Sequence, residues 1–230
     1  MAGERQVLVF DADDTLWENN IVFERVVEEF LDWVSTPELA RDGVRAVLDE
    51  VEAANIPVHG YGMRPFLRSL GDTLERLRGR PATGPELARV AEWAAAFERC
   101  GAELLPEVAG TLAELAGRHT LLMLTKGDLV EQRAKVAASG LERHFRDVRI
   151  VPEKDVAVYR ELGRTHGFPA GRTWMVGNSP RSDIVPARAA GWNAVFIPHQ
   201  RTWAWEEAAL DPADPGVLRL NRFGELLDHF

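Results

Sequence analysis

The chain has 230 residues, of which 46% are hydrophobic and 27% charged, and its formal net charge at pH 7 is -9. This length allows one large domain or two small ones, and the acidic balance supplies no basic stripe for nucleic acid. No apolar run approaches the ~20 residues of a membrane-spanning helix, and the single cysteine, Cys100, excludes an internal disulfide. Because the first six residues are also too short and polar for a signal peptide, we expect a cytoplasmic protein that binds neither nucleic acid nor membranes.

The first predicted strand is the apolar run from Val7 to Phe10, and three acidic residues, Asp11, Asp13 and Asp14, follow it closely. Three carboxylates at one strand end repel each other. A divalent cation would stabilise them, because hard cations prefer oxygen ligands. In extended backbone Asp11 and Asp13 lie on the same face, so one could attack a substrate while the other handles its proton. The alternative is an acidic turn that caps a helix or is simply solvated.

The next part of the chain, residues 17–105, shows only helical patterns. We predict four helices, over residues 21–34, from Thr36 to about 55, over 63–78, and from Thr83 to about Arg99. Residues 56–62 should form a loop. This segment is therefore predicted to be a helical domain inserted after the first strand, and its two connections, near residues 16–20 and 100–106, should run close together as a hinge.

From residue 106 onward helical and strand patterns alternate. The predicted helices are 107–118, 128–139, 156–166, 184–190 and 223–229, and the predicted strands are 120–124, 148–151, 173–177 and 194–197. Strands separated by helical segments of about 10–15 residues imply right-handed parallel crossovers. The predicted fold class is α/β: residues 1–16 and 106–230 form a doubly wound parallel sheet with its helices, and residues 17–105 form an inserted all-helical domain.

Polar residues also follow the second and third strands of this prediction. Thr125 and Gly127 lie between the second strand and a helix, where a hydroxyl and backbone N–H groups can bind a phosphate oxygen; an ordinary turn is the alternative for Thr125. Lys154 follows the third strand. Only three of the 27 basic residues are lysines, so a lysine here can mark a site that needs a compact ammonium. Lys126 is its rival for that role, and a solvated surface lysine is the alternative.

The fourth strand is followed by Gly-Asn-Ser-Pro-Arg-Ser-Asp, residues 177–183. The amide oxygen of Asn178 can ligate a hard cation but brings no charge, which makes Asp183 the main candidate for a metal-binding carboxylate. A helix cap before Ile184 is the alternative role for Asp183, and the two roles are compatible.

These motifs together resemble those of the haloacid dehalogenase superfamily of hydrolases. Residues 11–16, Asp-Ala-Asp-Asp-Thr-Leu, resemble the family's first motif, Asp-x-Asp-x-Thr/Val after an apolar strand. Thr125, Lys154 and residues 177–183 fall where the later motifs belong, and the family commonly carries a helical cap after the first strand. Asn178 departs from the common form, Gly-Asp-x-x-x-x-Asp.

The resemblance and the chemistry of these groups imply a phosphomonoester hydrolase for a small phosphorylated metabolite. Asp11 would attack phosphorus and form an aspartyl phosphate, while Asp13 would protonate the leaving alcohol and later activate water. Positively charged and polar groups would hold the phosphoryl oxygens, namely Thr125, Lys126, Gly127 and Lys154. Mg²⁺ would be held by oxygen atoms of Asp11, Asp13, Asp183 and Asn178.

Two segments are candidates for substrate selection. His59, Tyr61 and Arg64 belong to the predicted loop between helices of the insert and its margin, where a plain connection is an equal alternative. His199, Trp203 and Trp205 follow the last predicted strand, and tryptophans in such places more often pack than touch a ligand.

Four other functions stay open at this point. Carbon–halogen hydrolysis, which named the superfamily, needs no acid for an alcohol leaving group, whereas Asp13 offers one. A phosphomutase differs only in what accepts the phosphoryl group. A response-regulator receiver needs no helical insert and places its phospho-accepting Asp after a later strand. A degenerate phosphate-binding protein is an alternative because of Asn178.

Overall fold

The computed structural model describes residues 5–98 and 102–230. Arg99, Cys100 and part of the predicted connection 100–106 lie outside the described residues. The chain divides into two compact units, one formed by residues 1–20 and 102–230 and the other by residues 21–101. We refer to them as the core unit and the helical unit. Among the described residues, no helix combines the length and the apolar character needed to cross a bilayer.

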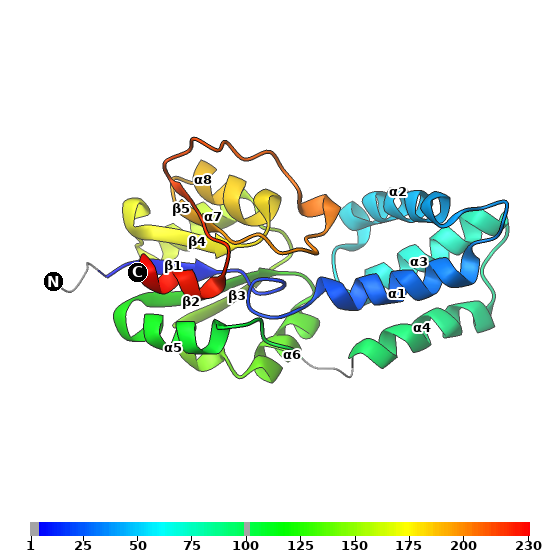
Figure 1. Cartoon of the computed structure of the whole chain (residues 1–230), viewed down its shortest axis with the longest axis horizontal. Helices are drawn as coiled ribbons and strands as arrows, with labels where there is room; N and C mark the ends of the chain where they lie inside the picture. Colours follow the sequence, from blue (N-terminus) through cyan, green and yellow to red (C-terminus); the bar gives the residue numbers. More distant parts are fainter. Residues whose placement is uncertain (1–4, 99–101) are drawn as a thin grey trace. The chain divides into compact units, whose positions relative to one another are not determined.

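The core unit is built on a six-stranded sheet in the order β3-β2-β1-β4-β5-β6, and each neighbouring pair is parallel (Figure 1). The strands are β1 (Val7–Phe10), β2 (Thr120–Lys126), β3 (Asp147–Val151), β4 (Thr173–Gly177), β5 (Asn193–Phe196) and β6 (Val217–Arg219). The predicted α/β fold with a parallel sheet is confirmed. The sequence did not reveal β6, which has only three residues, and the prediction ended with β5.

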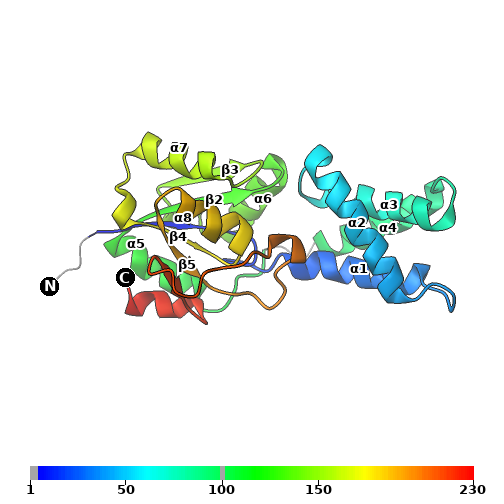
Figure 2. The same ribbon diagram turned by 90° about the horizontal axis from the view of Figure 1, so that it is seen from above.

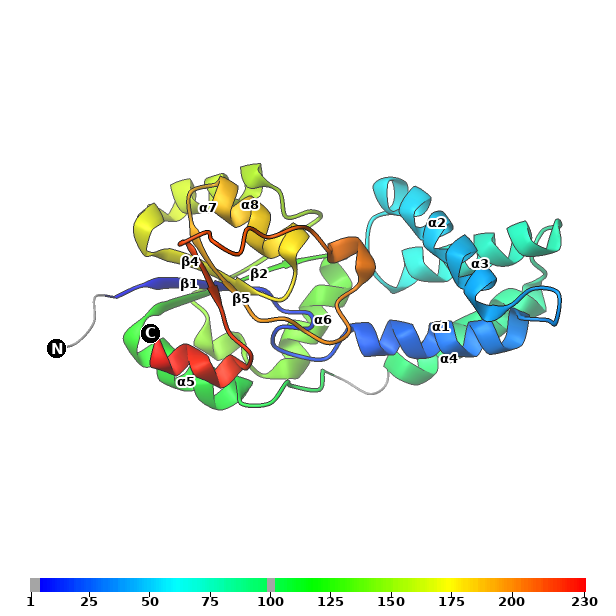
Figure 3. The same cartoon turned by 45° about the horizontal axis from the view of Figure 1, so that its top comes forward.

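Helices cover both faces of this sheet (Figure 3). Leu8 and Phe10 of β1 pack in the cluster formed with α5 (Val108–Arg118), α6 (Leu129–Ser139) and η5 (Phe223–Asp228). Val7 and Val9 pack in the opposite cluster, with α7 (Val156–His166) and α8 (Val185–Ala189). Burial on both faces explains why β1 is apolar at every position.

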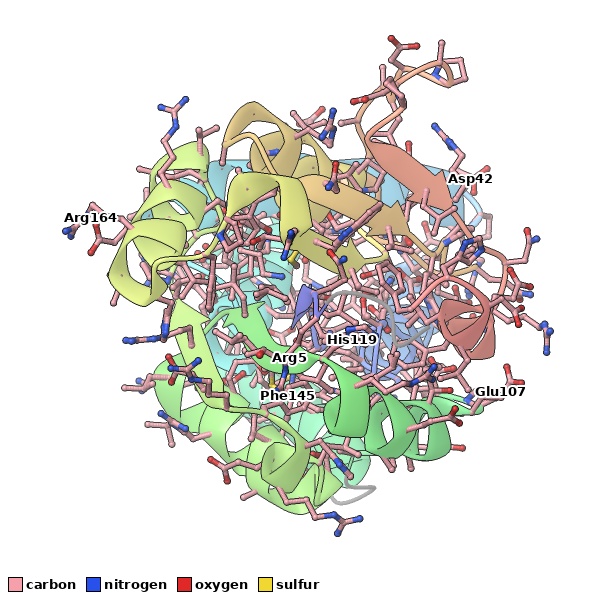
Figure 4. The ribbon with its side chains drawn as sticks, turned by 90° about the vertical axis from the view of Figure 1, so that its left-hand side faces the viewer. Arg5, Asp42, Glu107, His119, Phe145 and Arg164 are labelled. Carbon is pink, nitrogen blue, oxygen red and sulfur yellow. The ribbon has the colours of Figure 1, made fainter. Side chains whose placement is uncertain are left out.

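The strand order places the carboxyl ends of β1 and β4 at the centre of the sheet. From β1 the chain first adds strands on one side, β2 and then β3, and afterwards adds β4, β5 and β6 on the other. Open α/β sheets bind ligands at this switch point, outside the carboxyl ends of the strands. At the opposite edge, where the strands begin, the Arg5 guanidinium donates to the His119 carbonyl at 3.3 Å. The end-on view labels both residues (Figure 4).

The helical unit consists of α1 (Asn20–Val34), α2 (Arg41–His59), α3 (Met63–Arg78) and α4 (Gly84–Glu98) (Figure 2). Their apolar stripes form one hydrophobic cluster that includes Phe30, Leu48, Leu70 and Leu74. No strand lies between Asn20 and Glu98.

The prediction for the second helix was wrong at both ends. The helix begins at Arg41 because the Thr36 hydroxyl accepts the N–H of Leu39 at 3.1 Å and forms a turn instead of a cap. It continues to His59 with Pro57 inside it, and it ends where Gly60 takes φ 75°. The predicted loop 56–62 therefore shrinks to residues 60–62. Within the core unit, β2 is longer than predicted and contains Thr125, and a π-helical turn, η3 (Pro180–Ile184), precedes α8.

Candidate active site

Asp11 is held at the end of β1 by backbone and side-chain bonds. Its N–H donates to the carbonyl of Val176 at 2.9 Å, which extends the β1–β4 pairing by one residue. The chain then turns, because Leu16 donates its N–H to the carbonyl of Ala12 at 2.8 Å. This turn brings the Thr15 hydroxyl to 2.9 Å from Asp11 Oδ2, and the carboxylate is buried.

Lys154 joins two buried carboxylates of the site. Its ammonium donates to Asp11 Oδ1 and, at 2.7 Å, to Asp183 Oδ1. Only 3% of Lys154 is exposed. Burial by itself lowers the pKa of Lys154, but the charges of Asp11 and Asp183 outweigh it and hold the pKa above its usual range. The ammonium is therefore charged and pairs with the anionic site.

Asp183 is fully buried within η3. The N–H of Ser179 donates to its Oδ2 at 3.0 Å, so the carboxylate is bound by Ser179 and Lys154 and not by the N–H groups of α8. Burial, reinforced by the charge of Asp11, raises the pKa of Asp183 to about 7, although Lys154 acts in the opposite direction. A Cβ on Gly177 would lie 2.2 Å from Asp183 Oδ2, so the carboxylate packs directly on the strand end.

Asn178 lies beside this pair of carboxylates. Its Oδ1 is 3.1 Å from the Thr15 hydroxyl, which links it to Asp11, and its amide donates to the Thr202 hydroxyl at 3.3 Å. Two carboxylates share one ammonium here, and a side-chain amide oxygen lies close by. An oxygen-only donor set with excess negative charge fits a hard divalent cation such as Mg²⁺.

Asp13 has a separate set of partners. Its Oδ1 accepts the indole N–H of Trp17 at 2.7 Å, and its Oδ2 accepts the amide of Gln132 at 2.7 Å. The ammonium of Lys135 lies 3.0 Å from Oδ1 and 2.9 Å from Oδ2. Sequence reasoning weighed Lys126 and Lys154 and missed Lys135. The available signal was the three-residue spacing of Gln132 and Lys135, which places both on one face of α6.

Lys126 and Gly127 have partners of their own within the protein. Lys126 Nζ donates to the Ser182 hydroxyl at 2.8 Å and pairs with Glu206. Burial raises the pKa of Glu206, but Lys126 and neighbouring hydroxyls outweigh it and hold the pKa below its usual range. The N–H of Gly127 donates to the carbonyl of Val151 at 3.0 Å. Thr125 is buried near the end of β2.

The segment after β5 lies against the loop that follows Asp13. The Asp14 carboxylate accepts the backbone N–H groups of Asn19 and Asn20, both at 2.9 Å, and burial raises its pKa to about 6. His199 lies 3.9 Å from Asp14 and 3.4 Å from Glu18. One ligand atom from each of these three residues lies within 4.8 Å of the others, close enough for a metal ion, but backbone N–H groups already bind the Asp14 oxygens.

The other candidate residues lie after β5 and in the helical unit. Trp205 lies under the Arg181 guanidinium, 4.1 Å from the ring centroid, and its ring is 6.4 Å from that of Trp203. His59 is the last residue of α2, Tyr61 lies in the short loop, and Arg64 belongs to α3. The structure therefore brings Asp11, Lys154, Asp183 and Asn178 together in the core unit and places His59, Tyr61 and Arg64 in the helical unit.

Comparisons with known proteins show which family and which folds the chain resembles. Residues 6–191 match the model of haloacid dehalogenase-like hydrolases. A phosphoserine phosphatase of Thermus thermophilus is 28% identical, and the match covers 98% of both chains. A haloacid dehalogenase-like family hydrolase of Xanthomonas campestris superposes with a TM-score of 0.84 at 24% identity, covering 98% of this chain and 94% of the other. A magnesium-bound HAD-hydrolase of Bacillus subtilis superposes with a TM-score of 0.69 at 16% identity, covering 98% of this chain and 99% of the other.

The family match spans most of the chain and includes the ends of β1, β2, β3 and β4, where the site residues lie. The protein is an enzyme of the haloacid dehalogenase-like hydrolase family.

Proposed function

We propose that the protein is a Mg²⁺-dependent phosphomonoester hydrolase that acts on a small phosphorylated metabolite through an aspartyl phosphate on Asp11. The observation that carries this proposal is the buried arrangement in which Lys154 pairs with both Asp11 and Asp183 while Asp13 is held apart by other donors. The similarity to a phosphoserine phosphatase supports the reaction class.

In the first step Asp11 attacks phosphorus, and the bond from phosphorus to the ester oxygen breaks. The contacts of Lys154 and Thr15 with Asp11 fix the direction of the attacking carboxylate. Asp13 gives a proton to the departing alcohol oxygen. Lys154 and Thr125 bind the phosphoryl oxygens as negative charge shifts onto them.

In the second step a water molecule attacks the aspartyl phosphate and releases inorganic phosphate. Asp13, which has lost its proton to the alcohol, accepts one from this water, so both steps together leave the enzyme unchanged. Mg²⁺ bound by Asp11, Asp183, Asn178 and the Asp13 backbone carbonyl would supply the positive charge that offsets repulsion between the carboxylate and the phosphate.

We also propose that the helical unit serves as a cap that restricts substrates to small molecules, with His59, Tyr61 and Arg64 as candidates for substrate selection. The support is its place in the chain: it is inserted directly after the turn that follows Asp11. Its two connections are paired in the core unit, where the N–H of Glu18 donates to the carbonyl of Glu103 at 2.9 Å. Paired connections make a natural hinge.

The test is hydrolysis of 4-nitrophenyl phosphate by the wild type and by Asp11→Asn, with Mg²⁺ and with EDTA. We expect the wild type to turn over the substrate with Mg²⁺ but not with EDTA, and Asp11→Asn to show no turnover in either condition. Asp147→Asn is the matched control, since Asp147 lies at the amino end of β3, away from the site. Turnover by Asp11→Asn at the wild-type rate would refute the assignment of the nucleophile.

A further inference from the structure

Both oxygens of the Asp13 carboxylate accept hydrogen bonds, from the loop after β1 and from α6. Each of its oxygens lies within hydrogen-bonding distance of two N–H donors: Trp17 and Lys135 at Oδ1, and Gln132 and Lys135 at Oδ2. A carboxylate offers about four lone-pair positions, and all of them have a donor here. The plane and the direction of the carboxylate are therefore fixed.

The side-chain amide of Gln132 is oriented so that its oxygen lacks a hydrogen-bond partner among the described residues. It is 3% exposed, its amide nitrogen donates to Asp13 and to the carbonyl of Lys126 at 2.8 Å, and its Oε1 is buried without a hydrogen-bond partner among the described residues. A buried oxygen without a hydrogen-bond partner destabilises the folded chain. Rotating the amide would place Oε1 against the Asp13 carboxylate, so the charge of Asp13 sets the orientation.

The backbone makes room for this contact. Gly127 has φ 136°, and a Cβ at this position would lie 3.1 Å from Gln132 Nε2 and 3.3 Å from its Cγ. The Asp128 carboxylate caps α6 by accepting the N–H of Val130 at 2.9 Å, which fixes where the helix begins. Gln132 and Lys135 then project from the same face of α6.

We propose that Gln132 and Lys135 are positioning residues that aim the Asp13 carboxylate at the ester oxygen of the substrate. The inference rests on the proposed function, in which Asp13 protonates the leaving alcohol. Lys135 also donates to Asn19 Oδ1 at 2.6 Å, so its ammonium keeps a partner when one Asp13 oxygen turns to the substrate. Misplacing a reacting group by about 1 Å costs up to about 10²-fold in rate.

Leaving groups of different basicity distinguish positioning from a structural role. The alkoxide released from glycerol 2-phosphate needs a proton, whereas the nitrophenolate released from 4-nitrophenyl phosphate is stable as an anion. Gln132→Leu and Lys135→Met should lower kcat/KM for glycerol 2-phosphate by roughly 10–100-fold and kcat/KM for 4-nitrophenyl phosphate by only about 2–3-fold. The ratio kcat/KM is compared because it reports formation of the aspartyl phosphate and not its later hydrolysis, in which Asp13 serves both substrates alike. Lys135→Arg, which keeps the charge, should restore part of the loss.

Three comparisons make the outcome decisive. Arg133→Met on the same helix removes an exposed cation and should behave as the wild type toward both substrates. Asp13→Asn gives the full leaving-group effect; if it shows none, the acid role of Asp13 falls and this inference with it. If Asp13→Asn shows the effect while Gln132→Leu and Lys135→Met lower kcat/KM equally for both substrates, or for neither, the positioning role is refuted. Thermal unfolding verifies that each variant folds. If Lys135→Met does not fold, the single variants Lys135→Arg and Gln132→Leu are compared instead.

Discussion

Replacing Gly177 with alanine should damage the site although no charged residue is replaced. A Cβ there would lie 2.2 Å from Asp183 Oδ2 and 2.5 Å from its Cγ. Carbon–oxygen contact is ordinary only from 3.4 Å, so the carboxylate must retreat by roughly 1 Å. That movement pulls Asp183 away from Lys154 at 2.7 Å and from the N–H of Ser179 at 3.0 Å.

The expected loss of stability follows from the burial of Asp183. Asp183 is fully buried, and separating a buried ion pair costs about 3–5 kcal/mol. An alanine that fits its backbone stabilises a protein by about 0.4–1 kcal/mol through the unfolded state, which offsets a little of this loss. We expect a net loss of roughly 2–4 kcal/mol in the free energy of unfolding. For a chain of this length that corresponds to a fall of roughly 5–15 °C in the Tm of the core unit.

The assay combines thermal unfolding in EDTA with a Mg²⁺ titration of 4-nitrophenyl phosphate hydrolysis. The Mg²⁺ concentration that gives half-maximal rate should rise by roughly 10–100-fold in Gly177→Ala, because a metal ligand is displaced. Gly171→Ala is the matched control: a Cβ at Gly171 meets no atom within 4 Å, so Tm and Mg²⁺ requirement should match the wild type. A Gly177→Ala variant with wild-type Tm and Mg²⁺ requirement would contradict the packing of Asp183 described above.

Three further predictions concern the charged and polar side chains of the site. Lys154→Arg should reduce kcat strongly, because a planar guanidinium cannot replace a buried ammonium between two carboxylates. Lys126→Arg should reduce kcat less. A larger loss of kcat in Lys126→Arg than in Lys154→Arg would give Lys126 the phosphate-binding role. In EDTA, Asp183 should make the stability of the wild type fall as pH rises from about 4 to 7, because the folded Asp183, with pKa about 7, binds its proton more tightly than the unfolded chain does. Asp183→Asn should remove up to about 4 kcal/mol of this dependence, and an unchanged slope would contradict the shift. Asp14 and Glu52 act in the same direction as Asp183, and Glu206 in the opposite one. Asn178→Asp should bind Mg²⁺ at least as tightly as the wild type in the same titration, and weaker binding would mean that the added carboxylate repels the bound phosphate.

The sequence predicted the parts of the fold in which local pattern and packing agree. Strands buried on both faces must be apolar throughout, so β1 and β2 were recognisable. The start of α2 was misplaced because Thr36-Pro37 carries the signal of a helix start while its hydroxyl serves a turn. The three residues of β6 carry too little pattern to distinguish a strand from a loop.

The strand order predicted one part of the site and not the other. Parallel strands end at one edge of a sheet, so the closeness of Asp11, Lys154 and Asp183 followed from their places after β1, β3 and β4. The partners of Asp13 did not follow, because Gln132 and Lys135 reach it from the middle of α6, more than a hundred residues along the chain. Only tertiary packing brings that helix face to the loop after β1.

The central claim is that Asp11 becomes phosphorylated during turnover. The most direct measurement mixes the Mg²⁺-loaded enzyme with 4-nitrophenyl phosphate labelled with ³²P, quenches the reaction in acid within one turnover, and maps the label by proteolysis and mass spectrometry. We predict hydroxylamine-sensitive label on the peptide that contains Asp11, and no label in Asp11→Asn. A burst of nitrophenolate that precedes inorganic phosphate, without label on that peptide, would contradict Asp11 as the nucleophile, and label on another residue would move the nucleophile there.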